Sequence, residues 1–331
     1  MSGDDLARDE AEDVMEDIMS GVATPAQIAA WLVAMRNKGE TPEEIAACVA
    51  IMRRFAKPLR APEGVILDTC GTGGDGAGTF NISTVAALVV AGAGVRVAKH
   101  GNRSITSKCG SADVLTELAV NITCPAERME RALANANIGF AFAPLYHGAM
   151  RHAIGPRREI GVRTLFNMLG PMTNPAGARH QLIGVFEKRL TRFFADVLHL
   201  LGSERALVVH GSDGLDEITL TGPTYAAELR GGSIREFDID PREFGLTLCD
   251  ASDLAGGSPW ENKCIALEIL DGAKGPKRDI VLLNAGAALY VAGNAEDIAA
   301  GIRLAADSID GGRARAALNR LIEETRDDEP A

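Results

Sequence analysis

Two short loops in the first third of the chain carry residue types suited to binding a polyphosphate. Loop 71–79 is rich in glycine, and loop 99–103 places a lysine, a histidine, an asparagine and an arginine around one glycine. Glycine leaves backbone N–H groups open to an anion, and clustered cations attract one. The stretch 76–112 holds no Asp or Glu, although the chain has 34 basic and 45 acidic residues, a net charge of −11. The cations of this stretch are Arg96, Lys99, Arg103 and Lys108.

Two strands and the helix between them must position these loops. The apolar run 65–70 predicts a strand directly before the glycine-rich loop, and 95–100 predicts a second strand that leads into the basic loop. The small apolar residues between them predict a helix with its N-terminus at Ser83 and Thr84. Open α/β sheets bind ligands at the carboxyl ends of neighbouring strands. A polyphosphate site is therefore predicted at this edge of a sheet.

Two common nucleotide motifs are excluded. Gly71, Gly73 and Gly76 match the dinucleotide fingerprint by spacing, but that motif needs an acidic residue after the second strand, where this chain has Lys99-His100. An ATPase phosphate loop needs Gly-Lys-Ser/Thr, and Gly78 is followed by Thr79-Phe80. The alternative interpretation, that the glycine-rich loop is a turn that serves packing alone, stays open, although the adjacent basic loop argues against it.

Composition is typical of a soluble globular protein with a large core or two domains. Of 331 residues, 46% are apolar and 24% are charged. The longest apolar run, 85–95, is too short to span a membrane, and the acidic first twenty residues contain no hydrophobic signal region. Six scattered cysteines show no metal-binding spacing, so reduced thiols and a cytoplasmic location are expected. The negative net charge disfavours long-range attraction to nucleic acid.

The remaining chain predicts a helical start followed by alternating strands and helices. Residues 4–57 read as three helices, and Thr41-Pro42 with Glu44 forms a capping box. A strand is expected at 138–143, a structured loop at 165–175, and a hairpin around Gly231-Gly232. Further strands are expected at 181–186 and 205–210, and helices at 112–118 with Ser111 as its cap, from Pro125, and at 280–290, 295–305 and 316–324.

A second basic segment lies at 141–186, where Glu159 is the one acidic residue. Its cations suit an anionic aromatic substrate. A solvated basic helix face is the alternative interpretation. The cations are Arg151, Arg157, Arg158, Arg163 and Arg179.

These motifs, taken in order over nearly the whole chain, resemble the anthranilate phosphoribosyltransferase family. The matching residues are Gly71-Thr72-Gly73-Gly74-Asp75, Asn81-Ile82-Ser83-Thr84, Lys99-His100-Gly101-Asn102-Arg103, Ser111-Ala112-Asp113-Val114-Leu115, Gly161-Val162-Arg163-Thr164, Phe166-Asn167, Leu169-Gly170-Pro171, Thr173-Asn174-Pro175 and Gly214-Leu215-Asp216-Glu217. The resemblance implies the nucleoside phosphorylase/phosphoribosyltransferase-like α/β fold, with a small all-helical domain beside a large α/β domain whose central, mostly parallel sheet is flanked by helices. The expected boundaries are 1–64 with about 158–181 for the helical domain, and 65–157 with 182–331 for the α/β domain.

The resemblance also implies a reaction. Phosphoribose passes from phosphoribosyl pyrophosphate to the amino group of anthranilate, pyrophosphate leaves, and the product belongs to tryptophan biosynthesis. Mg²⁺ is the implied cofactor, because the leaving group is highly charged. No covalent nucleophile is required, and the sequence offers no convincing Ser-His-Asp or Cys-His arrangement.

Family positions carry over to this chain as follows. The implied donor-binding residues are Gly71, Gly74, Asp75, Thr79, Asn81, Ile82, Ser83, Thr84, Lys99, His100, Gly101, Asn102, Arg103, Ser107 and Ser111. The implied anthranilate-binding residues are Gly71, Asn102, His147, Arg157 and Pro171. The implied metal ligands are Ser83, Asp216 and Glu217. The chain departs from the family at Gly148, usually proline, and at Cys109 and Thr106, usually serine.

Two rival functions and one assembly complete the expectations. A pyrimidine nucleoside phosphorylase of related fold is the first rival, but the Gly71 loop and the Asp216-Glu217 pair, read as a metal site, favour a pyrophosphate donor instead. A non-catalytic nucleic-acid-binding relative would carry a strongly basic face, whereas this chain is acidic. The partners expected are therefore small molecules, with neither nucleic acid nor membrane. The resemblance implies a homodimer joined through the N-terminal helices. Apolar stripes there predict more apolar surface than one small domain buries: Ile28, Leu32, Met35, Ile45, Val49 and Met52.

Overall fold

A seven-stranded sheet forms the centre of the protein in the computed structural model, which describes residues 3–104 and 108–327. The strand order is β3-β2-β1-β4-β5-β6-β7; the first five are parallel, and β6 and β7 form an antiparallel hairpin at one edge. The predicted α/β fold with a mostly parallel sheet is confirmed. The strands are β1 Ile66–Gly71, β2 Arg96–Gly101, β3 Ile138–Phe142, β4 His180–Gly184, β5 Arg205–Gly211, β6 Thr224–Arg230 and β7 Ser233–Ile239.

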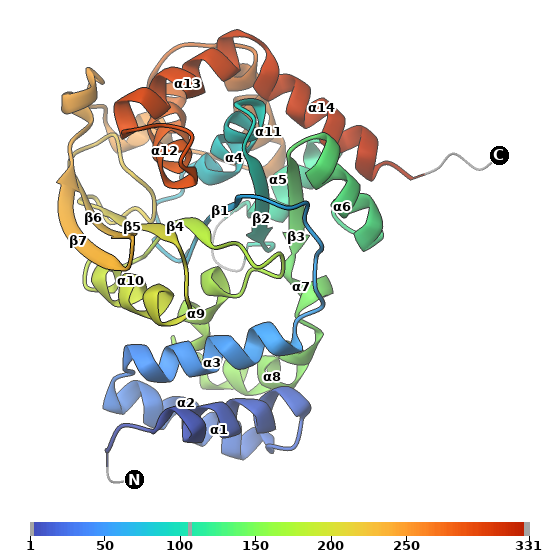
Figure 1. Cartoon of the computed structure of the whole chain (residues 1–331), viewed down its shortest axis with the longest axis vertical. Helices are drawn as coiled ribbons and strands as arrows, with labels where there is room; N and C mark the ends of the chain where they lie inside the picture. The colour runs from blue at the N-terminus through green and yellow to red at the C-terminus, as the bar shows by residue number, and fades with distance from the viewer. Residues whose placement is uncertain (1–2, 105–107, 328–331) are drawn as a thin grey trace.

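Helices cover both faces of the sheet (Figure 1). On one face, α4 (Ile82–Gly92) contacts β1 and β2, and α12 (Pro276–Ala292) contacts β1, β4 and β5. On the other, α10 (Leu190–Leu200) packs on β5, β6 and β7. Alternation along β5 follows from the two-residue period of a strand: Leu207 and Val209 join the α4–α12 core, whereas Ala206 and Val208 join the α10 core.

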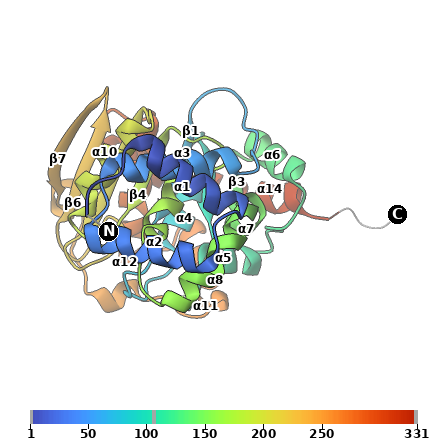
Figure 2. The ribbon, with the colours of Figure 1, turned by 90° about the horizontal axis from the view of Figure 1, so that it is seen from below.

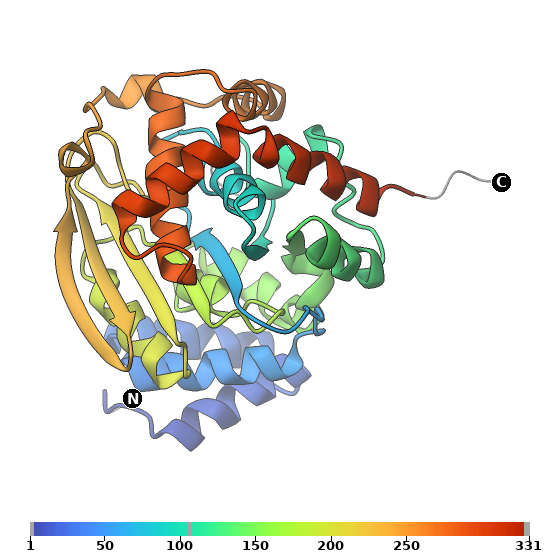
Figure 3. The same ribbon diagram turned by 45° about the horizontal axis from the view of Figure 1, so that its top comes forward.

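On the α4 side of the sheet, α13 (Ile298–Asp310) and α14 (Arg313–Thr325) pack against α4, and α14 also reaches α6 (Ala126–Asn135), as Figure 3 shows. Further elements between β2 and α12 are α5 Ser111–Glu117, α7 Ala143–Tyr146, η1 Gly148–Met150, α9 Phe166–Leu169, η2 Gly170–Met172, η3 Pro241–Phe244, η4 Ala251–Leu254 and α11 Pro259–Leu270. Helix α11 was missing from the sequence prediction, although its capping box of Ser258 and Glu261 is a local signal.

A separate helical unit lies beneath the sheet and in front of it when viewed from below (Figures 1 and 2). It consists of α1 (Arg8–Ser20), α2 (Pro25–Lys38), α3 (Pro42–Phe55) and α8 (Arg151–Ile160). Capping boxes start α2 and α3, because Thr24 accepts from the Gln27 N–H and Thr41 accepts from the Glu44 N–H. The three helices expected within residues 4–57 are present as α1, α2 and α3.

Three sequence expectations differ from the structure. The apolar stripes of α2 and α3 are buried inside the chain, with Leu32 and Val49 both 0% exposed, so they leave no excess apolar surface. The cause is cover from other elements: α8 lies against α2 and α10 lies against α3. Ser111 is the first residue of α5, which Gly110 caps, and the loop expected at 165–175 contains α9 and η2.

The domain division at 1–64 with about 158–181, against 65–157 with 182–331, stays a prediction. Two elements cross those boundaries. All of α8 from Arg151 onward lies against α1 and α2, and β4 begins at His180 within the sheet. Residues 151–157 therefore lie with the helical unit, because the contacts of a helix and not its sequence position decide which core it joins.

Candidate active site

Loops from three parallel strands meet at the carboxyl edge of the sheet. Gly71 at the end of β1 pairs with Gly184 at the end of β4, and Gly184 in turn pairs with Val209 of β5. The loop after β5 folds back over these ends, so closely that a Cβ on Gly184 would stand 1.5 Å from the Asp216 carbonyl oxygen. A Cβ on Gly71 would stand 2.4 Å from Asp216 Oδ2. Position 184 therefore requires glycine, whereas a side chain at position 71 would displace the Asp216 carboxylate.

The glycine-rich loop is held by backbone groups at its start. The Thr72 N–H donates to the Gly184 carbonyl at 2.9 Å, and the Gly73 N–H donates to Asp216 Oδ2 at 2.7 Å. On the far side, the segment before α11 lies against the loop, where the Gly256 N–H donates to the Gly78 carbonyl at 2.9 Å. The middle of the loop stays exposed and offers its N–H groups to an anion.

The three predicted metal ligands are brought together. Glu217 Oε1 accepts from the N–H of Ser83 in the first turn of α4 at 3.0 Å, and Asp216 is its chain neighbour. Burial raises the pKa of Asp216 to about 7 and that of Glu217 to about 8, and the negative charges of Asp75 and Asp216 add to the respective shifts. Such crowded carboxylates favour a cation between them.

These ligands fit a magnesium site that is completed by a substrate. Two carboxylates and a hydroxyl are hard oxygen ligands, and Mg²⁺ is commonly held by one or two carboxylates together with substrate phosphates. Within residues 3–104 and 108–327, no group of three or more His, Cys, Asp or Glu side chains is arranged to hold a metal by itself. The residues of this chain therefore suit a metal that shares its coordination with a bound pyrophosphate.

Lys99 is the buried cation of the site. Its Nζ donates to the Thr69 carbonyl and, at 3.2 Å, to Ser83 Oγ, while the side chain is 3% exposed. These bonds hold the ammonium between β1 and the N-terminus of α4, next to Glu217 through Ser83. The next residue, His100, donates its N–H to Asp68 Oδ1 at 3.1 Å, which anchors the end of β2 to β1.

The rest of the basic loop is closed by Asp113 of α5. Its carboxylate pairs with Arg103 Nη1 at 2.8 Å and accepts the Ser104 and Gly110 N–H groups at 3.1 and 2.9 Å. Ser111 Oγ donates to the Asn102 carbonyl at 3.3 Å. Predicted donor residues 99–103 and Ser111 thus lie together, whereas Ser107, with Thr106, lies outside the described residues.

Asn81 is engaged by protein groups through both ends of its amide. Its Nδ2 donates to the Cys109 carbonyl at 3.2 Å, and its Oδ1 accepts from Asn262 Nδ2 at 3.0 Å and from Cys109 Sγ at 3.3 Å. Asn262, on α11, is buried and accepts the Gly257 N–H at 2.8 Å. Sequence reasoning missed Asn262, which the capping box before it would have placed on a helix.

The predicted anthranilate residues come from both units. His100 and His147 lie with ring centroids 5.0 Å apart, and neither Nε2 has a hydrogen-bond partner among the described residues. Burial lowers the pKa of His100 to about 3 and that of His147 to about 4, so both rings are neutral. Pro171 is buried, and its carbonyl accepts from Gln181 Nε2 at 3.0 Å and from Cys70 Sγ, beside Gly71.

Arg157 of α8 is available for a ligand carboxylate. Its guanidinium lies 5.0 Å from the centroid of the Phe166 ring. No acidic side chain in the described part of the chain forms an ion pair with it, and burial lowers its pKa. Gly148, where the family pattern has proline, is exposed and has no atom within 4 Å of an added Cβ.

Models of the two glycosyl transferase domains match this chain: the helical bundle domain over residues 1–56 and the a/b domain over residues 63–315. The fold and site thus define a two-domain glycosyl transferase. Solved structures agree with this class. The anthranilate phosphoribosyltransferase (TrpD) of Thermus thermophilus has a TM-score of 0.94 at 44% identity over 98% of this chain and 97% of that one. The Saccharomyces cerevisiae enzyme in complex with PRPP and Mg has 0.88 at 29% identity over 97% and 93%.

Curated relatives narrow the class. Anthranilate phosphoribosyltransferase of Desulfosudis oleivorans is 54% identical over 97% of this chain and 95% of its own length. That of Geobacter sulfurreducens is 53% identical over 96% and 95%. The chain belongs to the anthranilate phosphoribosyltransferase family. The family predicted from the motifs is therefore confirmed, in preference to the phosphorylase and nucleic-acid-binding alternatives.

The two neutral histidines predict a pH dependence of stability. Below pH 6.5 the unfolded chain protonates both rings, whereas the native protein leaves them neutral down to about pH 4, so the contribution of these rings to the free energy of unfolding falls as the pH falls through this window. Each ring contributes a slope of roughly 1.4 kcal/mol per pH unit. In urea unfolding, His147→Gln should lower the slope of the free energy of unfolding against pH by about that amount relative to wild type.

The comparison with wild type isolates the ring, because the raised pKa values of Asp216 and Glu217 produce the opposite slope in the same window. His199→Gln, at an exposed position on α10, is the matched control and should leave the slope unchanged. Equal slopes for His147→Gln and wild type would contradict the assignment.

Proposed function

We propose that the protein transfers the 5-phosphoribosyl group of phosphoribosyl pyrophosphate to the amino group of anthranilate, giving N-(5-phosphoribosyl)anthranilate and pyrophosphate in tryptophan biosynthesis. The observation that carries this proposal is the meeting of the glycine-rich loop, buried Lys99 and the Asp216–Glu217 pair at one edge of the sheet. Relatives of this name are 50–54% identical over nearly the whole chain. One of the yeast structures contains PRPP and Mg, and another contains 4-fluoroanthranilate.

Donor binding rests on the residues at the carboxyl edge. The bond between the anomeric carbon and the pyrophosphate oxygen breaks, and negative charge grows on the leaving group. The loop N–H groups and Lys99 are already oriented by their own hydrogen bonds, so they stabilise this charge without reorganising. Ser83, Asp216 and Glu217 would hold Mg²⁺, which when bound neutralises charge on the pyrophosphate.

Acceptor binding is proposed to rest on Arg157, Asn102, His147, Pro171 and Gly71. The guanidinium of Arg157, free of any acidic partner in the described chain, is suited to a bidentate pair with the anthranilate carboxylate. Neutral His100 and His147 add no positive charge beside the aromatic amine. The carboxylate of anthranilate is a base adjacent to the reacting amine, so no protein base is assigned.

The protein is proposed to act as a cytoplasmic homodimer with small-molecule partners. Apolar side chains exposed on the helical unit support an interface there: Val22, Val33 and Ile154 are 69%, 38% and 48% exposed. No disulfide joins any of the six cysteines, all of which lie in the described part of the chain. Among the helices described, none combines the length and apolarity needed to cross a membrane.

Anthranilate turnover tests the proposed reaction. We expect the fluorescence of anthranilate to decay only when phosphoribosyl pyrophosphate and Mg²⁺ are both present, because the carboxylate pair and the loop require both ligands. Chelation of Mg²⁺ should stop the decay, and Asp216→Asn combined with Glu217→Gln should shift the Mg²⁺ titration. Phosphorolysis of thymidine without anthranilate turnover would instead support the nucleoside phosphorylase function.

Arg157→Ala should weaken the binding of anthranilate more than the binding of phosphoribosyl pyrophosphate. Losing a charge-assisted pair to a carboxylate costs about 1.5–3 kcal/mol, or roughly ten- to a hundredfold in the Michaelis constant for anthranilate. Arg158→Ala, at the exposed neighbouring position on α8, is the matched control and should change neither constant. Lys99→Ala should do the opposite and raise the Michaelis constant for phosphoribosyl pyrophosphate more than that for anthranilate. An Arg157→Ala protein with normal thermal unfolding and an unchanged anthranilate constant would exclude the acceptor role.

Light scattering tests the assembly. We expect a particle of twice the chain's 34.9 kDa, because exposed apolar side chains on the helical unit gain from mutual burial. A single-chain mass at high micromolar concentration would exclude the homodimer.

A further inference from the structure

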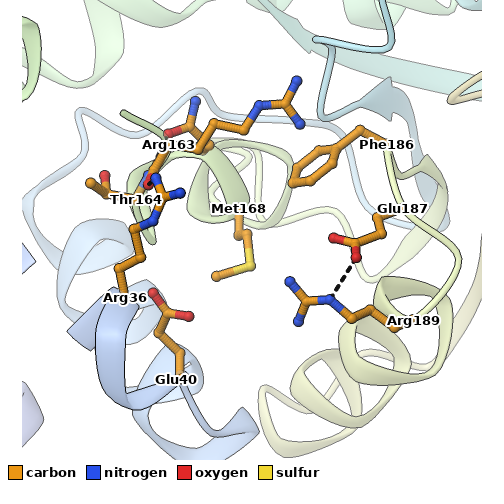
Figure 4. A pocket seen from close by; sticks show the side chains of 10 residues that line it. Arg36, Glu40, Arg163, Thr164, Met168, Phe186, Glu187 and Arg189 are labelled. Carbon is orange, nitrogen blue, oxygen red and sulfur yellow. Dashed lines mark hydrogen bonds and ion pairs between the residues drawn. The ribbon is translucent and has the colours of Figure 1, made fainter. Parts of the chain in front are cut away.

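A pocket of about 520 Å³ opens where the helical unit meets the sheet edge, and Figure 4 shows its lining from close by. Three separate parts of the chain contribute: Arg36 and Glu40 from the end of α2 and the turn after it, Arg163 and Met168 from the segment after α8, and Phe186 from the segment after β4. The pocket therefore lies at the junction between the helical unit and the α/β part of the chain, next to the glycine-rich loop.

Arg163 is the residue of this pocket that reaches the glycine-rich loop. Its Nη2 donates a hydrogen bond to the Gly74 carbonyl, and its guanidinium carbon lies 4.2 Å from the centroid of the Phe186 ring. Figure 4 shows the two side chains next to each other at one end of the pocket. A Cβ on Gly74 would stand 2.8 Å from Arg163 Nη2, so the arginine occupies the space that any larger residue at position 74 would need.

The backbone of the same residue is bound to the helical unit. Arg36 Nη1, on α2, donates to the Arg163 carbonyl at 2.6 Å. Arg163 thus joins α2 on its backbone side to the glycine-rich loop on its side-chain side. The described structure holds a chain of direct contacts from α2 through Arg163 to Gly74.

Three consecutive loop residues have different anchors. Thr72 is tied to the end of β4, because its Oγ1 accepts the Phe186 N–H at 3.1 Å. Gly73 is tied to Asp216. Gly74 is tied to Arg163. The first two anchors belong to the α/β part of the chain, and only the third connects through Arg36 to the helical unit.

We propose that Arg163 is a positioning residue that couples the placement of the helical unit to the conformation of the glycine-rich loop. The proposal deepens the proposed function and rests on it in one respect, namely that this loop binds the donor pyrophosphate. The helical unit also carries Arg157, assigned above to the acceptor. A displacement of the helical unit would therefore move Arg163 and, with it, the glycine-rich loop.

The geometry of the guanidinium group makes it possible to distinguish a positioning role of Arg163 from a purely electrostatic one. Arginine is planar, stacks on an aromatic ring and donates in a fixed direction, whereas a lysine ammonium keeps the charge and loses that geometry. If Arg163 positions the loop, Arg163→Lys should behave like Arg163→Gln. If it acts as a charge on the pyrophosphate, Arg163→Lys should restore most of the affinity. Arg163 is exposed, so neither change removes core packing.

The first experiment needs no substrate and measures amide hydrogen exchange of residues 72–78 in the intact protein. Exchange should be several-fold faster in Arg163→Gln, Arg163→Lys and Arg36→Gln than in wild type. Arg189→Gln, at the opposite side of the same pocket and paired with Glu187 at 2.9 Å, is the control and should match wild type. Unchanged exchange in Arg163→Gln would overturn the proposal.

The second experiment measures binding of phosphoribosyl pyrophosphate with Mg²⁺ by calorimetry, together with both Michaelis constants. Arg163→Gln and Arg163→Lys should weaken the binding of phosphoribosyl pyrophosphate about tenfold, because each removes one charge-assisted hydrogen bond. The Michaelis constant for anthranilate should change little. Arg36→Gln should shift the donor constant in the same direction. The double variant should equal Arg163→Gln alone, because Arg36 acts through Arg163.

Three results would overturn the proposal: rescue by Arg163→Lys, additive effects of Arg36→Gln and Arg163→Gln, or an equal rise of both Michaelis constants with a lowered melting temperature. A failure of the proposed function would look different. In that case wild type would bind no phosphoribosyl pyrophosphate, while the exchange experiment on the unliganded protein would still report whether Arg163 controls the loop.

Discussion

The site depends on one close approach between backbones. The loop after β5 returns over the ends of β1 and β4, and there is room for its backbone only because Gly184 carries no side chain. That contact places Asp216 under the glycine-rich loop, where its carboxylate accepts the Gly73 N–H, and brings Glu217 to the first turn of α4. A side chain at Gly184 would displace the carboxylate pair and the loop together.

A lysine and an acidic pair lie close together in this small volume. Lys99 and the carboxylate of Glu217 share Ser83 as a neighbour, with the ammonium bound to its hydroxyl and Glu217 bound to its N–H. Burial raises the pKa of both carboxyl groups because it disfavours their charged forms, and the like charges of neighbouring acids add to the effect. A divalent cation together with a pyrophosphate would satisfy both the acids and the surrounding donors.

The site also depends on supports outside the recognisable motifs. Asn81 has its amide occupied by Cys109 and Asn262, so it joins the start of α4 to the basic loop and to α11. Cys109, in place of the family's usual serine, keeps a donor toward Asn81. On the other side, Arg163 joins the helical unit to Gly74. The motif residues are thus held by side chains that come from three distant segments.

The sequence by itself determined the parts of this protein that are encoded locally. Apolar runs that end in glycine or basic residues predicted β1 and β2 with their loops, capping boxes predicted α2 and α3, and motif order over the whole chain predicted the family. Tertiary structure decided the rest. The bonds from Gly73 to Asp216, from Asn262 to Asn81 and from Arg163 to Gly74 join residues 143, 181 and 89 positions apart. No periodicity or spacing in a single sequence encodes such pairs, because they follow from how finished strands and helices pack. Packing likewise placed α8 with the helical unit and covered the apolar stripes of α2 and α3, which the sequence alone left exposed.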